Sequence, residues 1–416
     1  MLAPLRRNSA RQQVSSVAVA PAPTWGWDDG ASSLADMPPD HALVLDNWFP
    51  TPSDVRVRKG HTLHGYGMGT AAVETLMVYN ATSVASDKLF AVTGGSIYDV
   101  STAGVATVST VTGLSNNRLQ YVNFTTSGGH YLWCCNGADN PHHFDGSAWA
   151  VPNVTGITKA NIVHVNAHKN RLWFVMINST KAAYLATGAI AGAATEFDLG
   201  GLLDKGGYLV AMATWTLDGG SGQDDYAVFI SSKGQCAVYQ GTDPASSATW
   251  SLIGVFNLGS PLGRRCFTKV AGDVALINID GVLPLSKALR QDRGAVQEIA
   301  LSNRIQNAMA LAARDSFDSF GWELTPYPKG TMALLNVPIT EGSEQHQYVM
   351  NTLTGAWCRF KGQNANCWAV FKEDPYFGGN TGLVLKADHG ASDLTQTIDA
   401  VGQTGYTYYG SKGALK

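Results

Sequence analysis

Short apolar runs alternate with turn residues along most of the chain, from about residue 70 onward. Each run is rich in aromatic and β-branched residues, ends at a Gly, Asn or Asp turn, and is followed by a second short run, which predicts β-hairpins. We interpret the leading runs as the first strands of seven two-strand units. They are Lys88–Thr93, His130–Cys135, Arg171–Met176, Tyr226–Ile230, Val274–Asn278, Thr331–Leu335 and Cys367–Phe371.

The spacing of these runs predicts a radial repeat. Aligned on their central residues, successive runs lie between 36 and 58 residues apart, close to the roughly 40 to 50 residues of a propeller blade. Antiparallel sheets arranged around an axis bury both faces against their neighbours and leave only short edges exposed. The sequence therefore predicts an all-β fold, a β-propeller-like repeat of antiparallel blades with about seven hairpin units. The irregular spacing argues against a consensus repeat such as WD40.

One segment breaks the β pattern, between residues 285 and 314. It is rich in Ala, Leu, Gln and Arg, and its apolar residues have helical spacing, as in Ile305, Met309 and Ala312. We expect a helix or a helical pair inserted there. Arg290 and Arg293 would lie on its solvated face, or this face would form part of a contact between subunits.

The two ends of the chain differ from the repeat. Residues 1–40 predict a flexible N-terminal arm, whose basic start followed by Val14–Ala20 faintly imitates a secretory signal. Residues 41–416 form the predicted propeller body. Thr404–Gly410 resembles a β segment that is just beginning. Either this end pairs with the first strands to close the ring, or further sequence follows it.

Composition and charge narrow the range of partners. Of the 416 residues 45 are Gly, more than the usual share, while only 15% are charged and the net charge is −3. No Lys/Arg-rich block is long enough to follow a phosphate backbone, so sequence-specific nucleic-acid binding is not expected. No apolar stretch reaches the roughly 18 to 20 residues of a membrane-spanning helix, so no stable membrane insertion is expected.

Motifs for catalysis, metals and cofactors are absent from the sequence. It contains no HExxH, P-loop, GxSxG or suitably placed GxGxxG motif. Asp218–Gly220 begins like the aspartate box of sialidases but lacks the Trp that should follow, and Asp224 with Asp225 fits a solvated loop better than a cation site. His142 and His143 should face opposite ways on one strand. We therefore predict that the protein is not an enzyme and that it has no cofactor.

The six cysteines carry no metal-ligand spacing, and we interpret them as reduced thiols of the core. Cys134 and Cys135 are adjacent on a predicted strand, so their side chains should point to opposite faces. The other four are Cys236, Cys266, Cys358 and Cys367.

Two segments resemble the nozzle, or tail tubular hub, proteins of short-tailed bacteriophages. Leu45–Gly60, which reads LDNWFPTPSDVRVRKG, is similar to their opening motif. Tyr348–Phe360, followed by Phe377–Leu383 and Lys386–Asp388, resembles their blade hairpins. The turn Gly281–Ser286 before the predicted helix is similar to that family as well.

The resemblance implies a structural virion protein of the phage tail, assembled in the cytoplasm of the host bacterium. Such a subunit forms a ring, usually a hexamer, below the portal and adaptor proteins, carries tail fibres or spikes, retains packaged DNA and conducts it without sequence specificity at ejection. Arg56, Arg58, Lys59, Arg290 and Arg293 are the predicted interface residues. The alternative is a propeller that binds or cleaves host surface glycans.

Overall fold

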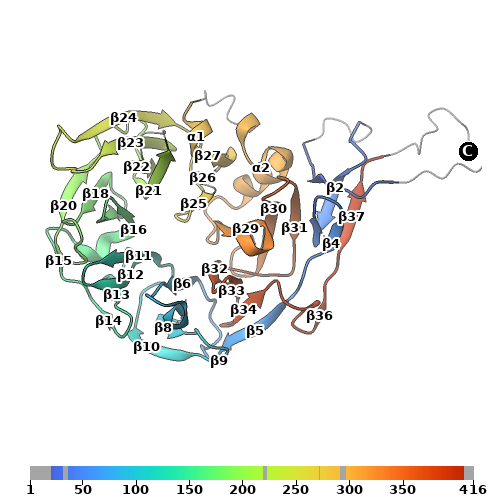
Figure 1. The fold of residues 1–416 in the computed structure, drawn as a ribbon, viewed down its shortest axis with the longest axis horizontal. Coiled ribbons are helices and arrows are strands. Elements are labelled where there is room, and N and C mark those ends of the chain that lie inside the picture. The colour runs from blue at the N-terminus through green and yellow to red at the C-terminus, as the bar shows by residue number, and fades with distance from the viewer. Residues whose placement is uncertain (1–19, 31–35, 219–222, 271, 291–296, 407–416) are drawn as a thin grey trace, which may run out of the picture.

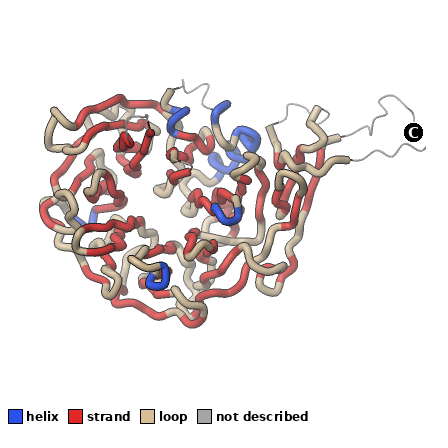
Figure 2. The backbone as a smooth tube through the Cα atoms, viewed as in Figure 1, coloured by secondary structure: helices blue, strands red, loops and turns tan. Residues whose placement is uncertain are grey.

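Seven sheets surround a common axis in the computed structural model of the protein (Figure 1). The structure describes residues 20–30, 36–218, 223–270, 272–290 and 297–406. The strands run outward from the axis in sequence order in the first six sheets, and each sheet is antiparallel within its blade. The fold is therefore a β-propeller, as the sequence predicts. Figure 2 shows that strands, not helices, make up most of its regular structure.

Blades 1 to 4 each consist of four strands in chain order. Blade 1 contains β6 (Thr75–Tyr79), β7 (Lys88–Thr93), β8 (Ser96–Asp99) and β10 (Thr107–Thr112). Blade 2 contains β11 (Gln120–Thr126), β12 (Gly129–Cys135), β13 (His142–Phe144) and β14 (Trp149–Ala150). Blade 3 contains β16 (Ile162–His168), β17 (Arg171–Met176), β18 (Lys181–Tyr184) and β20 (Thr195–Asp198). Blade 4 contains β21 (Leu209–Asp218), β22 (Gln223–Ser231), β23 (Gln235–Gly241) and β24 (Trp250–Asn257).

Blades 5 and 7 depart from that plan, and the sheet of blade 6 continues beyond its four strands. Blade 5 has three strands, β25 (Phe267–Val270), β26 (Asp273–Asn278) and β27 (Gly281–Pro284). Blade 6 contains β28 (Glu323–Tyr327), β29 (Met332–Thr340), β30 (Glu344–Asn351) and β31 (Trp357–Phe360). Blade 7 contains β32 (Cys367–Phe371), β33 (Asp374–Gly378), β34 (Val384–Ala387) and, from the other end of the chain, β5 (His61–Tyr66).

The strand β5 closes the ring, because it pairs antiparallel with β34 although more than 300 residues separate them. β5 thus supplies the fourth strand of blade 7. Beyond β5, β35 (Ser392–Asp393) and β36 (Gln396–Thr397) continue the same sheet.

Six of the seven runs that we interpreted as first strands are second strands of their blades, and only Cys367–Phe371 is a first strand. The second strands give the strongest apolar signal because neighbouring blades cover both of their faces. In β17, Trp173 and Val175 pack toward blade 4, while Leu172 and Phe174 pack toward blade 2. The units are therefore blades of three or four strands rather than hairpins.

A lateral extension, defined here as β1 (Gly26–Trp27), β2 (His41–Asp46), β3 (Trp48–Pro50), β4 (Val55–Val57), β35, β36 and β37 (Val401–Thr404), stands outside the ring at the right of Figure 1. β1, β2 and β37 continue the sheet of blade 6, and β3 pairs with β4 as a hairpin. Within the segment expected to be a flexible arm, Trp27 of β1 is only 5% exposed and packs in the largest core cluster. Residues 1–19 and 31–35 of that arm lie outside the described part.

The expected helical insertion contains two helices, α1 (Leu285–Ala288) and α2 (Gln306–Asp315), with a 3₁₀ turn at Asn303–Ile305. Both helices contact β27. The amide of Leu301 also donates to the Val282 carbonyl of this strand at 2.8 Å, so this segment covers the edge where the other blades have a fourth strand. No described helix is long and apolar enough to cross a membrane.

Further short elements lie within and between the blades. They are β9 (Gly104–Val105), β15 (Val154–Thr155), β19 (Gly192–Ala193) and 3₁₀ turns at Val84–Ser86, Lys159–Asn161 and Pro328–Gly330.

Candidate functional site

The two segments that carry the sequence resemblance lie against each other. Asp46, the last residue of β2, pairs in parallel register with Arg359 of β31. The guanidinium of Arg359 donates to both carboxylate oxygens of Asp46, at 2.7 and 2.8 Å. Asn351 donates to the carbonyl of Pro50 at 2.9 Å. Residues about 300 positions apart therefore form one contact, which we call the polar joint and which attaches the lateral extension to blade 6.

Arg58 is at the centre of the polar joint. Its side chain is 1% exposed, and it donates to the Asn47 side chain, to the carbonyls of Lys59 and Lys361, and to both oxygens of Asp393. All five guanidinium N–H groups are thus used within the chain. Burial alone would raise the pKa of Asp393, but the hydrogen bonds and charges of Arg58 and His61 together outweigh it and lower the pKa to about 2.

Asn47 explains why the chain can turn into this joint. Its φ is 59°, a left-handed conformation that asparagine tolerates better than most residues. The side chain donates to the Asp399 carbonyl at 2.7 Å and accepts from Arg58 Nε and from the Lys361 amide, both at 2.8 Å. One amide side chain therefore bridges the two motif segments and the C-terminal part of the chain.

The other predicted interface residues do not gather at one place. Arg56 on β4 is exposed and pairs with Asp54, whereas Lys59 is exposed and lies 3.4 Å from Asp388. Arg290 is exposed just after α1, and Arg293 lies outside the described residues. Contact of these residues with another copy stays a prediction, and the contacts of Arg58 are internal to its own chain.

Other residues that the sequence singled out have structural surroundings. Burial lowers the pKa of both His142 and His143. Asp225 accepts from Thr216 and pairs with Lys169 at 3.2 Å, and the side chains of Asp218 and Asp224 lie outside the described part. In the described ranges no group of three His, Cys, Asp or Glu side chains is placed to hold a metal ion.

All six cysteines are buried and free. Cys134 packs in the cluster between blades 1 and 2, and Cys135 in the cluster between blades 2 and 3. The expectation that they face opposite sides of one strand is confirmed.

A cavity lies where the innermost strands of the propeller begin, and we call it the channel mouth. Its volume is about 660 Å³. Single residues from successive blades line it, because each stands at or just before the start of an innermost strand. They include Glu74, Arg118, Gln120, Tyr208, Arg264 and Arg265.

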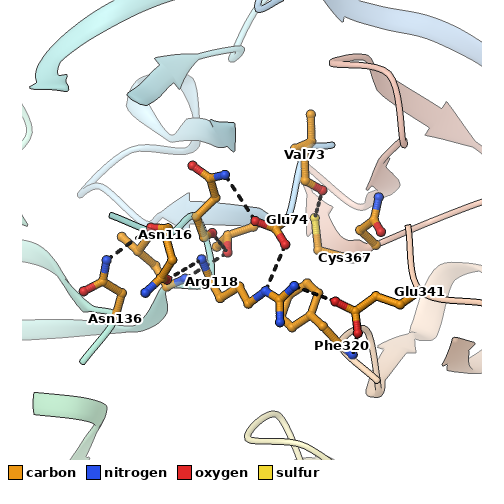
Figure 3. Close-up of polar contacts among 12 residues, drawn as sticks. Val73, Glu74, Asn116, Arg118, Asn136, Phe320, Glu341 and Cys367 are labelled. Carbon is orange, nitrogen blue, oxygen red and sulfur yellow. Dashed lines mark hydrogen bonds and ion pairs between the residues drawn. The ribbon is translucent and has the colours of Figure 1, made fainter. Parts of the chain in front are cut away.

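Arg118 bridges two blades across the channel mouth (Figure 3). Its Nε donates to Glu74 at 2.9 Å and its Nη2 donates to Glu341 at 2.6 Å. The guanidinium also lies 4.3 Å from the ring centroid of Phe320, within cation–π distance. This side chain links the start of blade 1 to the β29–β30 turn of blade 6.

Arg265 continues the network toward the axis. It pairs with Glu323 at 3.4 Å and donates to the Thr75 hydroxyl at 2.8 Å and to the Glu74 carbonyl at 3.0 Å. Burial raises the pKa of Glu323, and the guanidinium of Arg265 opposes this rise. The two arginines therefore link blades 1, 2, 5 and 6.

Sequence reasoning did not find the channel mouth. Its residues are isolated in the sequence and come together only through the circular arrangement of the blades. The adjacent Arg264 and Arg265 gave no distinctive local signal, because adjacent charged residues also occur elsewhere, as at Arg58–Lys59.

Comparisons with known proteins identify no family for this chain. No protein-family model matches the sequence, and no curated protein matches it. Among solved structures, BBS1N in complex with ARL6DN aligns with 81% of this chain and 100% of its own at 10% identity and a TM-score of 0.48. The extracellular domain of the putative one component system BT4673 from B. thetaiotaomicron aligns with 86% of this chain and 48% of its own, at 9% identity and a TM-score of 0.47.

YCF48 from Cyanidioschyzon merolae aligns with 82% of this chain and 97% of its own, at 12% identity and a TM-score of 0.41. At such low similarity these proteins carry no argument about what the chain does. The class of the protein, a seven-bladed β-propeller with a lateral extension, rests on its own strand pairing.

Proposed function

We propose that the protein is a structural subunit of a phage tail nozzle. Copies of the chain assemble into a ring, a hexamer in this proposal, attached below the portal and adaptor proteins. The ring retains packaged DNA, carries fibres or spikes, and forms the conduit for genome ejection. The proposed location is the tail of the virion.

The observation that carries this proposal is the polar joint. The two sequence segments that resemble nozzle proteins form one contact through the ion pair of Asp46 with Arg359. Arg58 of the first segment is buried beside it and pairs with Asp393 near the C-terminus. A chance resemblance of two short segments gives no reason for them to meet. The joint also builds the feature that a simple propeller lacks, the lateral extension.

The lateral extension offers surface for contact between copies. β37 is the last strand of its sheet among the described residues, so one of its edges has no described partner. Apolar side chains are exposed on this extension, with Val57 at 44%, Leu394 at 43% and Val401 at 47% exposure. Apolar surface next to an open strand edge suits a subunit interface.

We propose that the conduit lies outside the propeller itself, because the axial cavities are small. The two largest cavities along the innermost strands have volumes of about 660 and 440 Å³, which is the size of small-ligand pockets. The major groove of B-DNA alone is about 12 Å wide, so a duplex does not fit such cavities. In the proposed ring DNA passes between the copies, and the net charge of −3 limits its retention on the surface.

Electron microscopy and mass measurement of the purified full chain test this proposal. We expect rings with a central hole and a mass six times that of the 44.2 kDa chain, and labelled protein at the tail of intact particles. A Val401→Lys variant should weaken the ring, whereas Val105→Lys, at a site on β9 that is 69% exposed, should leave it intact.

A protein that stays monomeric at every concentration and also binds or degrades a host capsular polysaccharide would overturn the proposal. That result would favour the glycan-directed alternative.

A further inference from the structure

Arg264 stands apart from the other arginines of the channel mouth. It is partly buried, and its Nη1 has one weak hydrogen bond, 3.4 Å long, to the carbonyl of Val210. Its guanidinium carbon lies 5.9 Å from the ring centroid of Tyr208. No carboxylate of the described residues forms an ion pair with it. A positive charge is thus held at the cavity wall without a counter-charge.

The acidic groups nearby are engaged elsewhere. Glu74 and Glu341 pair with Arg118, and Glu323 pairs with Arg265. Asp318 lines the outer part of the cavity but is exposed to solvent. Burial lowers the pKa of Arg264, and only tyrosine and cysteine side chains, not carboxylates, oppose this shift. An arginine keeps its proton under such conditions, so the cost of burying the charge is left uncompensated within the chain.

A second group at the same place lacks a partner. Gln120, at the start of β11, is only 9% exposed, and its side-chain amide has no hydrogen bond to any described residue. It lines the channel mouth and also the inner axial cavity, as Arg264 does. The amide atoms of Gln120 are not among the fully buried side-chain atoms that lack a partner, so this amide is open to the cavity and can bond a ligand or water there. An unpaired cation and an unpaired amide therefore flank the same passage between two cavities.

We propose that the channel mouth binds a small oxyanion ligand, a carboxylate or phosphate carried on a sugar-sized body, with Arg264 as the anchoring residue. The planar guanidinium can donate two parallel hydrogen bonds to either oxyanion. The amide of Gln120 donates to or accepts from a hydroxyl of the ligand body. The cavity of about 660 Å³ has the volume of a small-ligand site.

The aromatic part of the wall limits the shape of the ligand. Tyr208 and Phe317 line the cavity and are 37% and 38% exposed, although rings of this size are usually buried. Their faces offer flat apolar surface beside the charge, which suits the apolar face of a sugar ring. A bare inorganic ion would leave that surface uncovered.

Isothermal titration calorimetry of the full chain at low salt tests the site with three matched probes. Glucuronate carries a carboxylate, glucose 6-phosphate carries a phosphate, and glucose carries neither. We expect saturable millimolar binding of at least one charged probe and none of glucose, and the preferred probe identifies the oxyanion. Arg264→Gln should weaken this binding about tenfold or more, since a hydrogen bond to a charged group is lost. Arg264→Lys should retain part of it.

Arg314→Gln serves as the control, because Arg314 is an exposed arginine of α2 that pairs with Asp315 and does not line the cavity. Thermal unfolding of each variant shows whether it is folded. Three results would each overturn the inference: no binding of either charged probe, equal binding of glucose, or binding unchanged in a folded Arg264→Gln variant. The inference does not rest on the nozzle proposal. Ring assembly is tested by measuring the particle mass, and the proposed contacts between copies do not involve this cavity.

Discussion

Replacing Arg58 by methionine tests how the polar joint contributes to stability. Methionine has a similar length but removes all five donors, so the carboxylate of Asp393, whose side chain is 12% exposed, loses its guanidinium partner. Removing one partner of a buried ion pair typically costs about 3–5 kcal/mol. The lowered pKa of Asp393 provides an independent magnitude. A fall from 3.8 to about 2 corresponds to about 2 kcal/mol, at roughly 1.4 kcal/mol per tenfold change in proton affinity.

The pH dependence of this loss has a definite sign. The folded-state pKa of Asp393 lies below its unfolded value, so its contribution is fully present above about pH 4 and is lost as the pH falls toward 2. In the Arg58→Met variant burial acts on Asp393 without the guanidinium that opposed it, so this carboxylate takes up a proton at higher pH. The difference in unfolding free energy between the two proteins should therefore be largest near pH 7 and shrink between pH 5 and pH 3.

Urea unfolding at pH 7, 5 and 3 measures this difference. Arg56→Met is the matched control, because Arg56 is an exposed arginine of the neighbouring strand, and its loss should leave the unfolding midpoint almost unchanged. The reasoning would be refuted by an Arg58→Met variant within about 1 kcal/mol of the original protein, well below the cost expected for a buried pair. A gap that stays constant from pH 7 to pH 3 would contradict the assigned role of Asp393.

Two further expectations concern the core. Gly382→Ala should destabilise blade 7 by roughly 2–4 kcal/mol in urea unfolding, because an added Cβ would meet the Gly69 carbonyl at 2.2 Å and φ is +68°. Gly342→Ala should cost only about 1 kcal/mol, since φ is +73° but the space is open; equal losses would show that the contact with Gly69 is unimportant. Burial raises the pKa of Cys134 to about 12 and that of Cys135 further, so a thiol reagent should label the cysteines only after unfolding. Rapid labelling of the folded protein at pH 8 would contradict this.

The sequence predicts the blades because its second strands are covered on both faces. Strands such as Arg171–Met176 consist almost entirely of buried residues, and the spacing of such runs follows the blade repeat. The innermost strands were missed because they face the axis with polar side chains. Gln120–Thr126 alternates Asn and Thr with Tyr, Val and Phe, so its apolar signal is weak. The closing strand His61–Tyr66 was not located either, since its partner Val384–Ala387 is near the other end of the chain.

The surroundings of the candidate site residues could not be predicted from the sequence either, for a different reason. The sequence predicted one group of interface residues in Arg56, Arg58 and Lys59, yet their side chains have different surroundings. Arg56 and Lys59 are exposed, whereas Arg58 is buried. Alternation on a short strand places neighbours on opposite faces, but only the partner across the fold decides which face is buried. For Arg58 that partner is Asp393, which is 335 residues away in the sequence.

The polar joint and the closure of the propeller share one carboxylate. Asp393 Oδ1 accepts from Arg58, which follows β4, and lies 3.0 Å from Nδ1 of His61, the first residue of β5. Asp393 itself belongs to β35, which pairs with β5 in parallel. The strand that closes the propeller is therefore fixed by the same side chain that holds the lateral extension. A force applied to the extension would reach the blades through buried, charge-assisted hydrogen bonds rather than through a flexible linker. A subunit that contacts its neighbours through such an extension needs this rigidity. Movement within the joint would change the angle between neighbouring copies, and these changes would add up around the ring of subunits.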